Sequence, residues 1–276
     1  MISFRKSQLS GLHYLIIKEL KRAIWGTIGE PYEIPGHTLR YEPGSGSRPI
    51  LTKYTTSRNN NARYDALQVK RFSSDLSEGD VAIDLGAHAG QYSLIMAALC
   101  GSSGRVIAFE PDPYAHQLLE RNLALNPKIK RPTIEIVALS DVSGEAIFYS
   151  KGGNTQSSLT RSGLGGAAAD SDIEEIRVPT MRLDDYVSDN NIPVPRWIKI
   201  DAEGAEIRIL QGMKNLLCTN AGVVRELHPY AWAEFGTTMA DLRRLADAAN
   251  RRIRYMDRDD EVENPVYGTV FLEPLA

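Results

Sequence analysis

The sequence is poor in cysteine, has no long apolar run and carries little excess of either charge. Two cysteines in 276 residues exclude a disulfide scaffold and a multi-cysteine zinc site. No apolar run approaches the roughly 20 residues that cross a bilayer, and the N-terminus lacks the pattern of a signal peptide. A formal net charge of −3 argues against a general nucleic-acid binder, which needs a basic surface. We therefore expect a cytoplasmic α/β enzyme or binding protein.

The first 75 residues differ from the remainder, so we predict an N-terminal extension over 1–75 and a main domain over 76–276. Apolar residues recur at helical spacing near the N-terminus and predict an amphipathic helix, namely Leu9, Leu12, Ile16, Leu20 and Ile24. This helix could pack on the main domain, pair two copies as a homodimer, or act as a lid or a membrane-surface contact. A second helix is expected over Tyr64–Leu76.

From residue 81 onward, short apolar segments alternate with helical ones. We predict strands at Val81–Leu85, Arg105–Phe109, Ile134–Leu139, Trp197–Ile200, Val223–Leu227, Arg252–Met256 and Val266–Leu272. Helices are predicted near 91–99, 113–125, 205–217 and 238–250, the last with a capping box formed by Thr238 and Asp241. This alternation is typical of an α/β fold with a parallel sheet covered on both faces.

One region interrupts the alternation. Three strand-like segments, Glu145–Tyr149, Ser157–Thr160 and Ile176–Met181, predict a small antiparallel insertion beside the main sheet. They flank a glycine-rich tract over Gly163–Ala169, which is either a mobile cover for a site or a surface loop.

The turn after the first predicted strand of the main domain has the composition of a ligand-binding loop. It reads DLGAHAG over Asp84–Gly90. Open parallel sheets bind ligands beyond the carboxyl ends of their strands, and glycine lets the backbone turn tightly there. Glu110 ends the next strand about 20 residues after Gly90, a spacing typical of an acid that binds ribose hydroxyls. The two strands therefore predict a nucleoside-binding half.

The spacing of the glycines narrows the choice of nucleoside. A dinucleotide site needs Gly-x-Gly-x-x-Gly, whereas this loop has Gly-x-x-x-Gly, with His88 in place of a glycine. Asp84 is a poor neighbour for phosphate but suits an amino group. S-adenosylmethionine carries an ammonium, a carboxylate, a sulfonium and a ribose, and no phosphate. We therefore predict this cofactor, with Asp84 near its ammonium and Glu110 at its ribose.

Five ordered blocks, spread over roughly residues 65–229, resemble those of the FkbM family of S-adenosylmethionine-dependent methyltransferases. They are VAIDLGAHAGQYS (81–93), VIAFEPDP (106–113), VALSD (137–141), VPTMRLDDYV (178–187) and IKIDAEGAE (198–206). Members mostly methylate hydroxyl oxygens of sugars and polyketides. The resemblance implies a Rossmann-like class I methyltransferase fold, with a seven-stranded, mostly parallel sheet whose last strand is antiparallel. This chain departs from the family at His88, where asparagine is usual.

The resemblance also implies the contacts of the cofactor. Glu110 would hold the ribose, and the turn after the first strand would line the methionine part. Further residues would border the methionine part or the adenine, namely Gly86, Ala87, His88, Gly90, Tyr92, Pro111, Ser140 and Asp141. Asp141 would accept a hydrogen bond from the adenine amine, although an ordinary turn role is open for it.

The ends of the fourth and fifth strands supply candidates for the chemistry. Asp201 follows the fourth strand and is predicted at the boundary between cofactor and methyl acceptor, although it could instead cap the following helix. His228 follows the fifth strand and is predicted to accept the hydroxyl proton, because an unperturbed imidazole has a pKa of about 6.5. Asp201, Glu226 and His228 could instead hold a divalent cation, although no spacing specifies one.

These observations predict an O-methyltransferase that acts on a hydroxyl of a sugar or polyketide-type small molecule. Methylation of nitrogen in a nucleic acid or protein is an alternative, as are a non-catalytic cofactor-binding protein and a nicotinamide oxidoreductase. Two short basic clusters, 128–131 and 251–254, are interpreted as solvated faces, and a salt-sensitive affinity for DNA or RNA would favour a nucleic acid instead.

Overall fold

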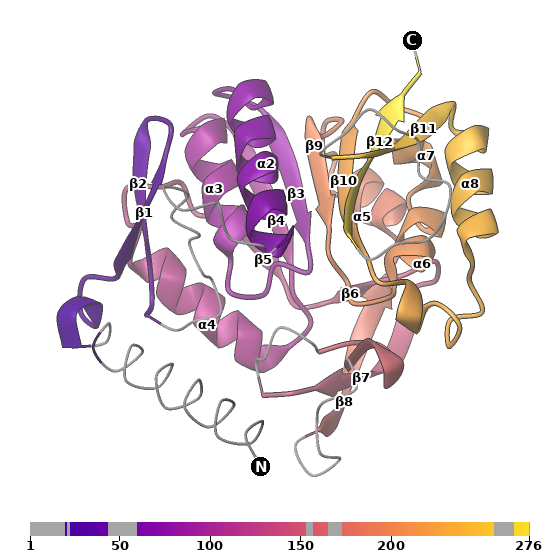
Figure 1. Ribbon diagram of the computed structural model, residues 1–276, viewed down its shortest axis with the longest axis horizontal. Helices are drawn as coiled ribbons and strands as arrows, with labels where there is room; N and C mark the ends of the chain where they lie inside the picture. The colour runs from indigo at the N-terminus through magenta and orange to yellow at the C-terminus, as the bar shows by residue number, and fades with distance from the viewer. Residues whose placement is uncertain are drawn as a thin grey trace, which may run out of the picture.

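A twisted seven-stranded sheet forms the centre of the computed structural model, which describes residue 20 and residues 23–43, 60–152, 157–164, 173–256 and 268–275 (Figure 1). The strand order is β11-β12-β10-β9-β3-β4-β5. The strands span Val81–Leu85 (β3), Arg105–Phe109 (β4), Thr133–Glu135 (β5), Trp197–Ile200 (β9), Gly222–Leu227 (β10), Arg251–Tyr255 (β11) and Gly268–Pro274 (β12). β12 runs opposite to the other six strands of this sheet, which confirms the predicted class I methyltransferase sheet.

The strand order reverses between β3 and β9. From β3 the chain continues through β4 and β5 to one edge, and then returns to β9 and β10 on the other side of β3. Such a switch point opens a crevice at the carboxyl ends of the two central strands, where α/β proteins bind ligands. The fold therefore brings the ends of β3, β4, β9 and β10 to one edge.

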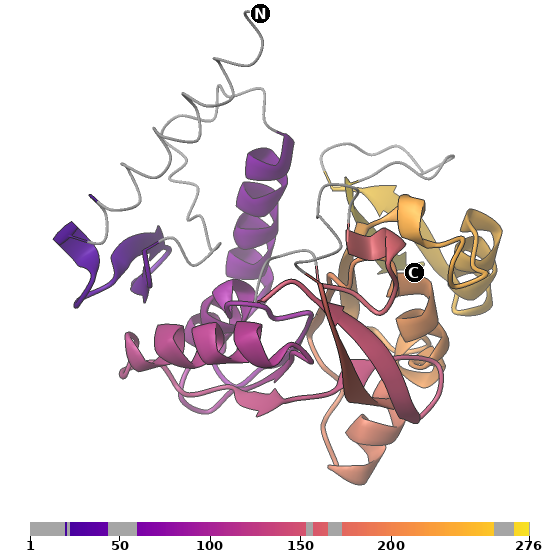
Figure 2. The ribbon, with the colours of Figure 1, turned by 90° about the horizontal axis from the view of Figure 1, so that it is seen from below.

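Helices cover both faces of the sheet, as expected for strands that are apolar on both sides (Figure 2). One face carries α2 (Asn60–Asp75), α3 (Gln91–Cys100) and α4 (Pro113–Ala124). The other carries α5 (Leu183–Asp189), α6 (Glu206–Gln211), α7 (Lys214–Leu217) and α8 (Met239–Ala248). Two hydrophobic cores result: the first lies between the sheet and α2–α4, and the second between the sheet and α5–α8. Side chains alternate along β3, so that Ala82 belongs to the first core and Ile83 to the second.

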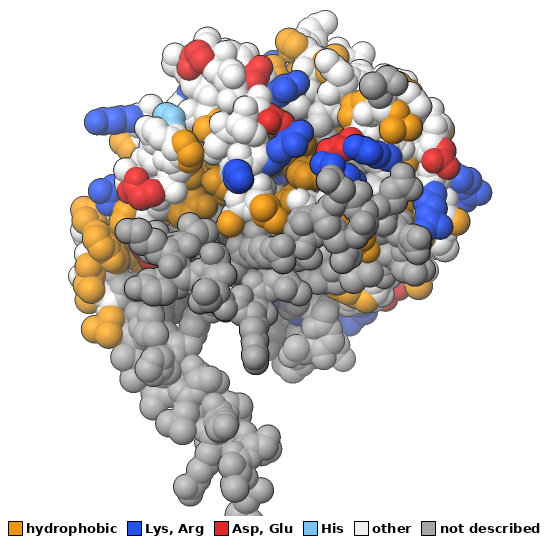
Figure 3. Space-filling model, turned by 45° about the horizontal axis from the view of Figure 1, so that its top comes forward, with side chains coloured by type: hydrophobic (Ala, Val, Ile, Leu, Met, Phe, Trp, Pro, Cys, Tyr) orange, Lys and Arg blue, Asp and Glu red, His pale blue; other side chains and the backbone are white. Residues whose placement is uncertain are grey.

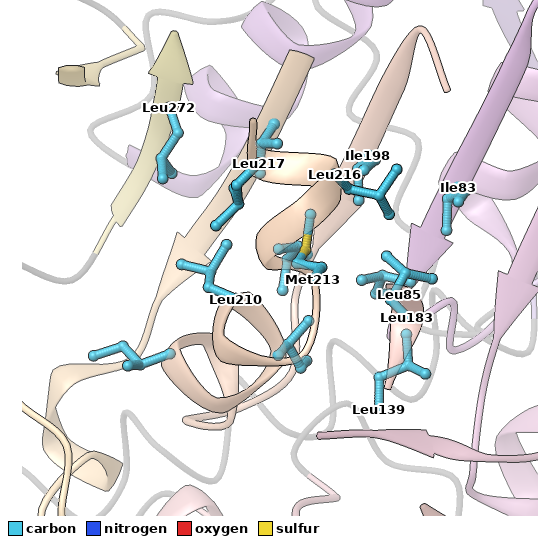
Figure 4. Packing of buried hydrophobic residues seen from close by; sticks show 14 of the residues in the cluster. Ile83, Leu85, Leu139, Leu183, Ile198, Leu210, Met213, Leu216, Leu217 and Leu272 are labelled. Carbon is cyan, nitrogen blue, oxygen red and sulfur yellow. The ribbon is translucent and has the colours of Figure 1, made fainter. Parts of the chain in front are cut away.

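The second core consists mainly of aliphatic side chains from the sheet and from the helices α5–α8 that cover it. Figure 4 shows Leu210 and Met213 of the helical layer facing Leu85 and Ile198 of the strands. All four side chains are at most 1% exposed. Each contributes roughly 1.5–3 kcal/mol by leaving water, which fixes the strand ends that carry the site.

Parts of the first 75 residues join the first core. β1 (Glu30–Ile34) and β2 (His37–Tyr41) form an antiparallel hairpin. Its Leu39 and Tyr41, with Phe72 of α2, are buried in one cluster with α3. The division of the chain at residue 75 stays a prediction. Most of the predicted N-terminal helix lies outside the described residues, and within them Leu20 and Ile24 are exposed.

Two predicted elements are divided in the structure. The strand predicted over Ile134–Leu139 splits into β5 and β6 (Ala138–Leu139), because β6 leaves the main sheet to pair with β8 (Glu174–Met181). The helix predicted over 205–217 splits into α6 and α7 at Gly212, where a Cβ atom would lie 2.1 Å from the carbonyl oxygen of Ser140. The first break therefore follows from pairing with β8, and the second lies where the chain around Ser140 approaches Gly212 closely.

A small second sheet lies beside the carboxyl edge, at the bottom of Figure 1. Its order is β6-β8-β7, with β7 spanning Gly144–Ser150. The pair β7–β8 is antiparallel as predicted, but β6 and β8 are parallel. Of the predicted glycine-rich tract, only Gly163 and Leu164 fall within the described residues, in a short 3-10 helix, η2 (Ser162–Leu164).

Local sequence rules hold at two helix starts. The side chain of Asp112 accepts a hydrogen bond from Tyr114 N ahead of α4, with Pro113 in its first turn, and Thr238 and Asp241 form the predicted capping box of α8. None of the helices in the described part of the chain is both long and apolar enough to span a membrane.

Candidate active site

The loop after β3 turns over the end of β4. Gly86 N and Ala87 N both donate to the carbonyl oxygen of Phe109, at 3.0 and 3.1 Å, and Gly90 N donates back to Ala87 O. His88 has φ 47°, a left-handed conformation in which asparagine, aspartate and histidine are enriched. The backbone at this position therefore accounts for both the usual asparagine and the histidine found here. The amides of Gly86, Ala87 and Gly90 are already bonded, so donors for a ligand carboxylate would come from the first turn of α3.

Glu110 lies under this loop at the end of β4 and is 5% exposed. Its Oε2 accepts from His88 N at 2.6 Å and its Oε1 from Asp112 N at 2.8 Å. Burial raises the pKa of Glu110 to about 7, although the two N–H groups lower it. Each carboxylate oxygen has a second lone pair for a hydroxyl donor. The carboxylate is thus oriented by the loop and faces away from bulk solvent.

Asp84 supports the loop from inside the core and is fully buried. Its Oδ2 accepts from Ser93 Oγ at 2.6 Å, and its Oδ1 lies 3.4 Å from Lys199 Nζ without a hydrogen-bond partner. Burial raises the pKa of Asp84, against the charge of Lys199. The predicted Tyr92 belongs to the same group, since its ring lies 5.0 Å from Lys199 Nζ.

The cofactor loop (86–90, after β3) meets the predicted acceptor side, the ends of β9 and β10 that carry Asp201 and His228, at Gly86. A Cβ atom on Gly86 would lie 1.8 Å from the backbone oxygen of Asp201, and Asp201 N donates to Leu85 O at 3.0 Å. Only glycine permits this approach, and its φ of 74° is also a conformation that glycine adopts readily. The end of β9 is therefore fixed directly against the loop after β3.

The structure gives hydrogen bonds or ion pairs for two of the residues predicted around the adenine, Ser140 and Asp141. Pro111 follows Glu110 and is partly buried. Asp141 pairs with Arg208 of α6, at 3.1 Å, and accepts from Ser140 Oγ at 3.0 Å. The structure thus places Ser140 and Asp141 beside the second helical layer, and their adenine contact stays a prediction.

His228 follows β10 and is held by an acid. It is 2% exposed, and its Nδ1 lies 2.7 Å from Glu206 Oε1. Glu206 also accepts from Trp232 Nε1 at 2.9 Å and from Gly204 N at 2.8 Å. Glu206 therefore does more than complement the dipole of α6, and it fixes which nitrogen of the imidazole faces outward.

The outward nitrogen faces two further carboxylates. His228 Nε2 lies 3.5 Å from Glu203 Oε2 and 4.0 Å from Asp201 Oδ1. The Asp201 side chain is 31% exposed, and its other oxygen lies 3.5 Å from Lys199 Nζ. Asp201 does not cap the following helix, whose N-cap is Ala205. Of the predicted cation ligands, Asp201 and His228 come together with Glu203 in place of Glu226.

The acids determine the protonation of His228. Burial opposes the charged imidazole, but the hydrogen bond and charge of Glu206, with the charges of Glu203 and Asp201, raise the pKa of His228 to about 10. The same contacts lower the pKa of Glu206 against the effect of its burial. A protonated imidazole donates hydrogen bonds and accepts no proton. The predicted role of His228 therefore requires removal of its Nε2 proton.

Sequence reasoning does not select Lys199 or Trp232, which the structure brings into the site. Lys199 is 4% exposed and interrupts an otherwise apolar strand, Trp197–Ile200, directly before an acid. A charged residue inside such a strand needs a buried partner, so the pattern could have identified it. Trp232 lies beyond the strand end and offers no comparable pattern.

The residues present fit S-adenosylmethionine. The loop contains an oriented carboxylate, Glu110, for ribose hydroxyls. Beneath it lies Asp84, which is fully buried and paired with Lys199 Nζ at 3.4 Å, so its predicted contact with the cofactor ammonium stays a prediction. The loop has Gly-x-x-x-Gly rather than the Gly-x-Gly-x-x-Gly of a dinucleotide site, and the amides of Gly86, Ala87 and Gly90 are bonded within the fold.

Comparison with known proteins agrees with this geometry. The family model described as the methyltransferase FkbM domain matches residues 84–253. The chain is 26% identical over 195 residues to the hexuronic acid methyltransferase AglP of Haloferax volcanii, a match that covers 70% of this chain and 73% of AglP. It is 27% identical over 168 residues to the 31-O-demethyl-FK506 methyltransferase FkbM of Streptomyces tacrolimicus, covering 52% of this chain and 64% of that protein.

A crystal structure of a methyltransferase FkbM from Methylobacillus flagellatus resembles the chain with a TM-score of 0.46 and 12% identity, covering 77% of this chain and 60% of that one. The family model spans well over half of the chain and includes the loop after β3, Glu110, Asp201 and His228. The chain belongs to the FkbM methyltransferase family and is an S-adenosylmethionine-dependent methyltransferase.

Proposed function

We propose that the protein methylates a hydroxyl oxygen of a sugar or polyketide-type small molecule. The observation that carries this proposal is the contact between the two halves of the site, where Gly86 of the cofactor loop meets the backbone of Asp201. S-adenosylmethionine, when bound, supplies a methyl group activated by its sulfonium. The relatives named for a hexuronic acid and for demethyl-FK506 support an oxygen acceptor of this class.

The protein's part in such a reaction is to hold, orient and remove a proton. Glu110 would accept hydrogen bonds from the ribose hydroxyls and fix the cofactor above β4. Asp201 is the partly exposed carboxylate of the acceptor side, so an incoming hydroxyl can donate to it. Because methyl transfer needs the acceptor oxygen about 3 Å from the methyl carbon and in line with the sulfur, this positioning supplies much of the rate.

We also propose that His228 takes part in removing the proton of the acceptor hydroxyl. Its Nε2 faces Asp201 and Glu203, and Glu206 behind it prevents rotation of the ring. A hydroxyl placed between Asp201 and His228 would therefore meet one carboxylate and one imidazole nitrogen. Loss of the hydroxyl proton to this pair, to Asp201 directly or to His228 once its Nε2 proton has left, is the step that we assign to the chain's own side chains.

The basic clusters at 128–131 and 251–254 give little support to a nucleic acid as the methyl acceptor. Lys130 donates to Gly104 O, and Arg131 pairs with Glu120. Arg251 is buried and bonded to backbone carbonyls, and Arg252 and Arg254 pair with Glu273. On the described part of the face in Figure 3, acidic and basic side chains lie among one another. These cations are therefore engaged within the fold, which disfavours a nucleic-acid surface.

The proposal is tested with S-adenosylmethionine carrying a ¹³C methyl group. The protein is incubated with a uronic acid glycoside, a neutral glycoside, a macrolide-type alcohol, a peptide and an RNA, and products are identified by mass spectrometry and NMR. We expect an O-methyl product from a glycoside or the macrolide, and reduced turnover in Asp201→Asn. Methylation of nitrogen alone, or cofactor binding without turnover of any acceptor, would contradict the proposal.

A further inference from the structure

We propose that Asp201, Glu203 and His228 form a binding site for one divalent cation at the acceptor side of the proposed active site. The three residues come from two neighbouring strand ends, and their ligand atoms all lie within 4.8 Å of one another. This inference rests on the proposed function for its place in the reaction, but cation binding itself can be measured independently of turnover.

The distances are those of atoms that can share one ion. Metal–ligand distances of about 2.0–2.2 Å allow two ligands of one ion to lie up to about 4.4 Å apart. His228 Nε2 lies 3.5 Å from Glu203 Oε2 and 4.0 Å from Asp201 Oδ1, so both pairs fall within this limit. The third pair, between Asp201 and Glu203, lies within 4.8 Å, so closing the group on a cation requires rotation of a side chain.

An outer layer of hydrogen bonds orients these three ligands. Metal-binding histidines usually donate their other ring N–H to a carboxylate, and Glu206 stands in that position at 2.7 Å from Nδ1. Lys199 binds the far oxygen of Asp201, and Tyr230 donates to Glu203 Oε2 at 3.0 Å. His228 Nε2 and Asp201 Oδ1 face the common centre, and Glu203 Oε2 lies there while it also accepts from Tyr230.

The charges around the group also favour a cation. Asp201, Glu203 and Glu206 surround one imidazole, while Lys199 pairs with Asp201 and the charge of the buried Arg225 interacts with Glu206. Two carboxylates and one imidazole form a mixed oxygen and nitrogen set, which suits Mn²⁺ or a similar borderline divalent ion better than Ca²⁺. Binding would displace the Nε2 proton to solvent.

Three protein ligands leave coordination positions open, as in catalytic rather than structural metal sites. The open side is that of Asp201, whose side chain is 31% exposed and adjoins the cofactor loop through Gly86. A cation there would lower the pKa of a neighbouring acceptor hydroxyl, so that no strong base is needed. The role predicted for His228 would then pass from its imidazole to the ion that it binds.

The test is direct titration of the full chain. Protein is treated with EDTA, desalted and titrated with MnCl₂, while free Mn²⁺ is followed by its electron paramagnetic resonance signal. We expect one bound Mn²⁺ per chain, and affinity lower by at least about tenfold in Glu203→Gln. The matched control is Glu226→Gln, which removes a neighbouring acid outside the three ligands and should change affinity by less than about threefold.

Each variant must bind S-adenosylhomocysteine as the wild type does, which shows that the fold is retained. Absence of Mn²⁺, Mg²⁺ and Zn²⁺ binding at about 1 mM, or equal Mn²⁺ affinity in Glu203→Gln, would overturn the cation site. Unchanged methyl transfer in EDTA-treated protein would overturn its place in the reaction and leave the proposed function standing. Binding of one Mn²⁺, lost in Glu203→Gln, supports the site even where the acceptors fail.

Discussion

Glu110 shows how one buried side chain can join a loop to a ligand. Its two oxygens each hold one backbone N–H, from His88 and Asp112, so the carboxylate is oriented before any cofactor arrives. The spacing from Gly90 predicts Glu110 as the ribose-binding acid, which stays a prediction, and the structure places Glu110 against the loop because β3 and β4 are adjacent parallel strands. Its raised pKa could not be predicted, since burial depends on the packing of the whole edge.

Replacement of Glu110 should weaken cofactor binding. Glu110→Ala removes an acceptor of charge-assisted hydrogen bonds from ribose hydroxyls, so we expect a loss of about 1–3 kcal/mol in the affinity for S-adenosylhomocysteine. Isothermal titration calorimetry measures this difference. Glu120→Ala, which removes an exposed acid of α4 paired with Arg131, serves as the control and should bind normally. Equal affinity of the two variants would remove Glu110 from the site.

Cofactor binding should also depend on pH through Glu110. Burial raises the pKa of Glu110 to about 7 in the ligand-free chain, and ribose hydroxyls bind best to the ionised carboxylate. Below this pKa most chains carry the neutral acid, so affinity should rise by about tenfold from about pH 6 to about pH 8. Glu110→Gln should bind more weakly and lose this part of the pH dependence. A pH profile shared by wild type and variant would assign the titration to another group.

The ends of the strands are the elements that create the site. β3 and β9 are held together at Gly86, where the backbone of Asp201 occupies the space of a side chain. The sequence predicts the bounds of β3, β4 and β9 correctly, because short apolar runs bounded by turns are typical of buried strands. The split of the third strand depends on pairing with β8, far along the chain, and no local pattern encodes it.

Gly86→Ala should destabilise the fold strongly. The new Cβ atom would lie 1.8 Å from a backbone oxygen, and φ is 74°. Gly36, in the turn between β1 and β2, has a similar φ of 80° but nothing within 4 Å, so Gly36→Ala measures the cost of the conformation alone, about 1–2 kcal/mol. We expect Gly86→Ala to lose at least about 2 kcal/mol more in urea denaturation. Similar losses would contradict the contact with Asp201.

Asp184 should stabilise the start of α7. It is 7% exposed and accepts from Asn215 N at 2.9 Å and from Leu216 N at 3.1 Å. Asp184→Ala leaves these donors without an acceptor, so we expect a loss of about 1–3 kcal/mol in the free energy of unfolding. Asp185→Ala removes the adjacent, more exposed acid and should change it by less than about 0.5 kcal/mol. Equal effects of the two variants would exclude this capping role.

At the scale of the whole molecule, the extension and the sheet share one hydrophobic core. Leu39 and Phe72 are fully buried with α3, and Tyr41 donates to Gln91 O at 3.0 Å, beside the cofactor loop. Composition predicts a boundary near residue 75 because turn-rich sequence changes there to regular alternation. It does not reveal this packing, since the contacts join segments about 50 residues apart.

A fragment of residues 76–276 should therefore be less stable than the full chain. Removal of Leu39, Tyr41 and Phe72 exposes the outer side of α3, and loss of one large buried aromatic side chain typically costs about 3–5 kcal/mol. We expect the fragment to lack a cooperative unfolding transition in circular dichroism, and Phe72→Ala in the full chain to lower the transition. A fragment as stable as the full chain would show that residues 76–276 fold independently.

The segment between β7 and β8 also contacts the proposed acceptor side, through the backbone of Glu203. Ser158 Oγ donates to the carbonyl oxygen of Glu203 at 2.8 Å, and a Cβ atom on Gly163 would lie 2.4 Å from the same oxygen. Replacing the segment between β7 and β8 with that of a relative would thus change the position of Glu203 and leave the central strands unchanged. Acceptor preference can diverge by this route, and chimeric enzymes made at this segment would be the natural starting point for redirecting it.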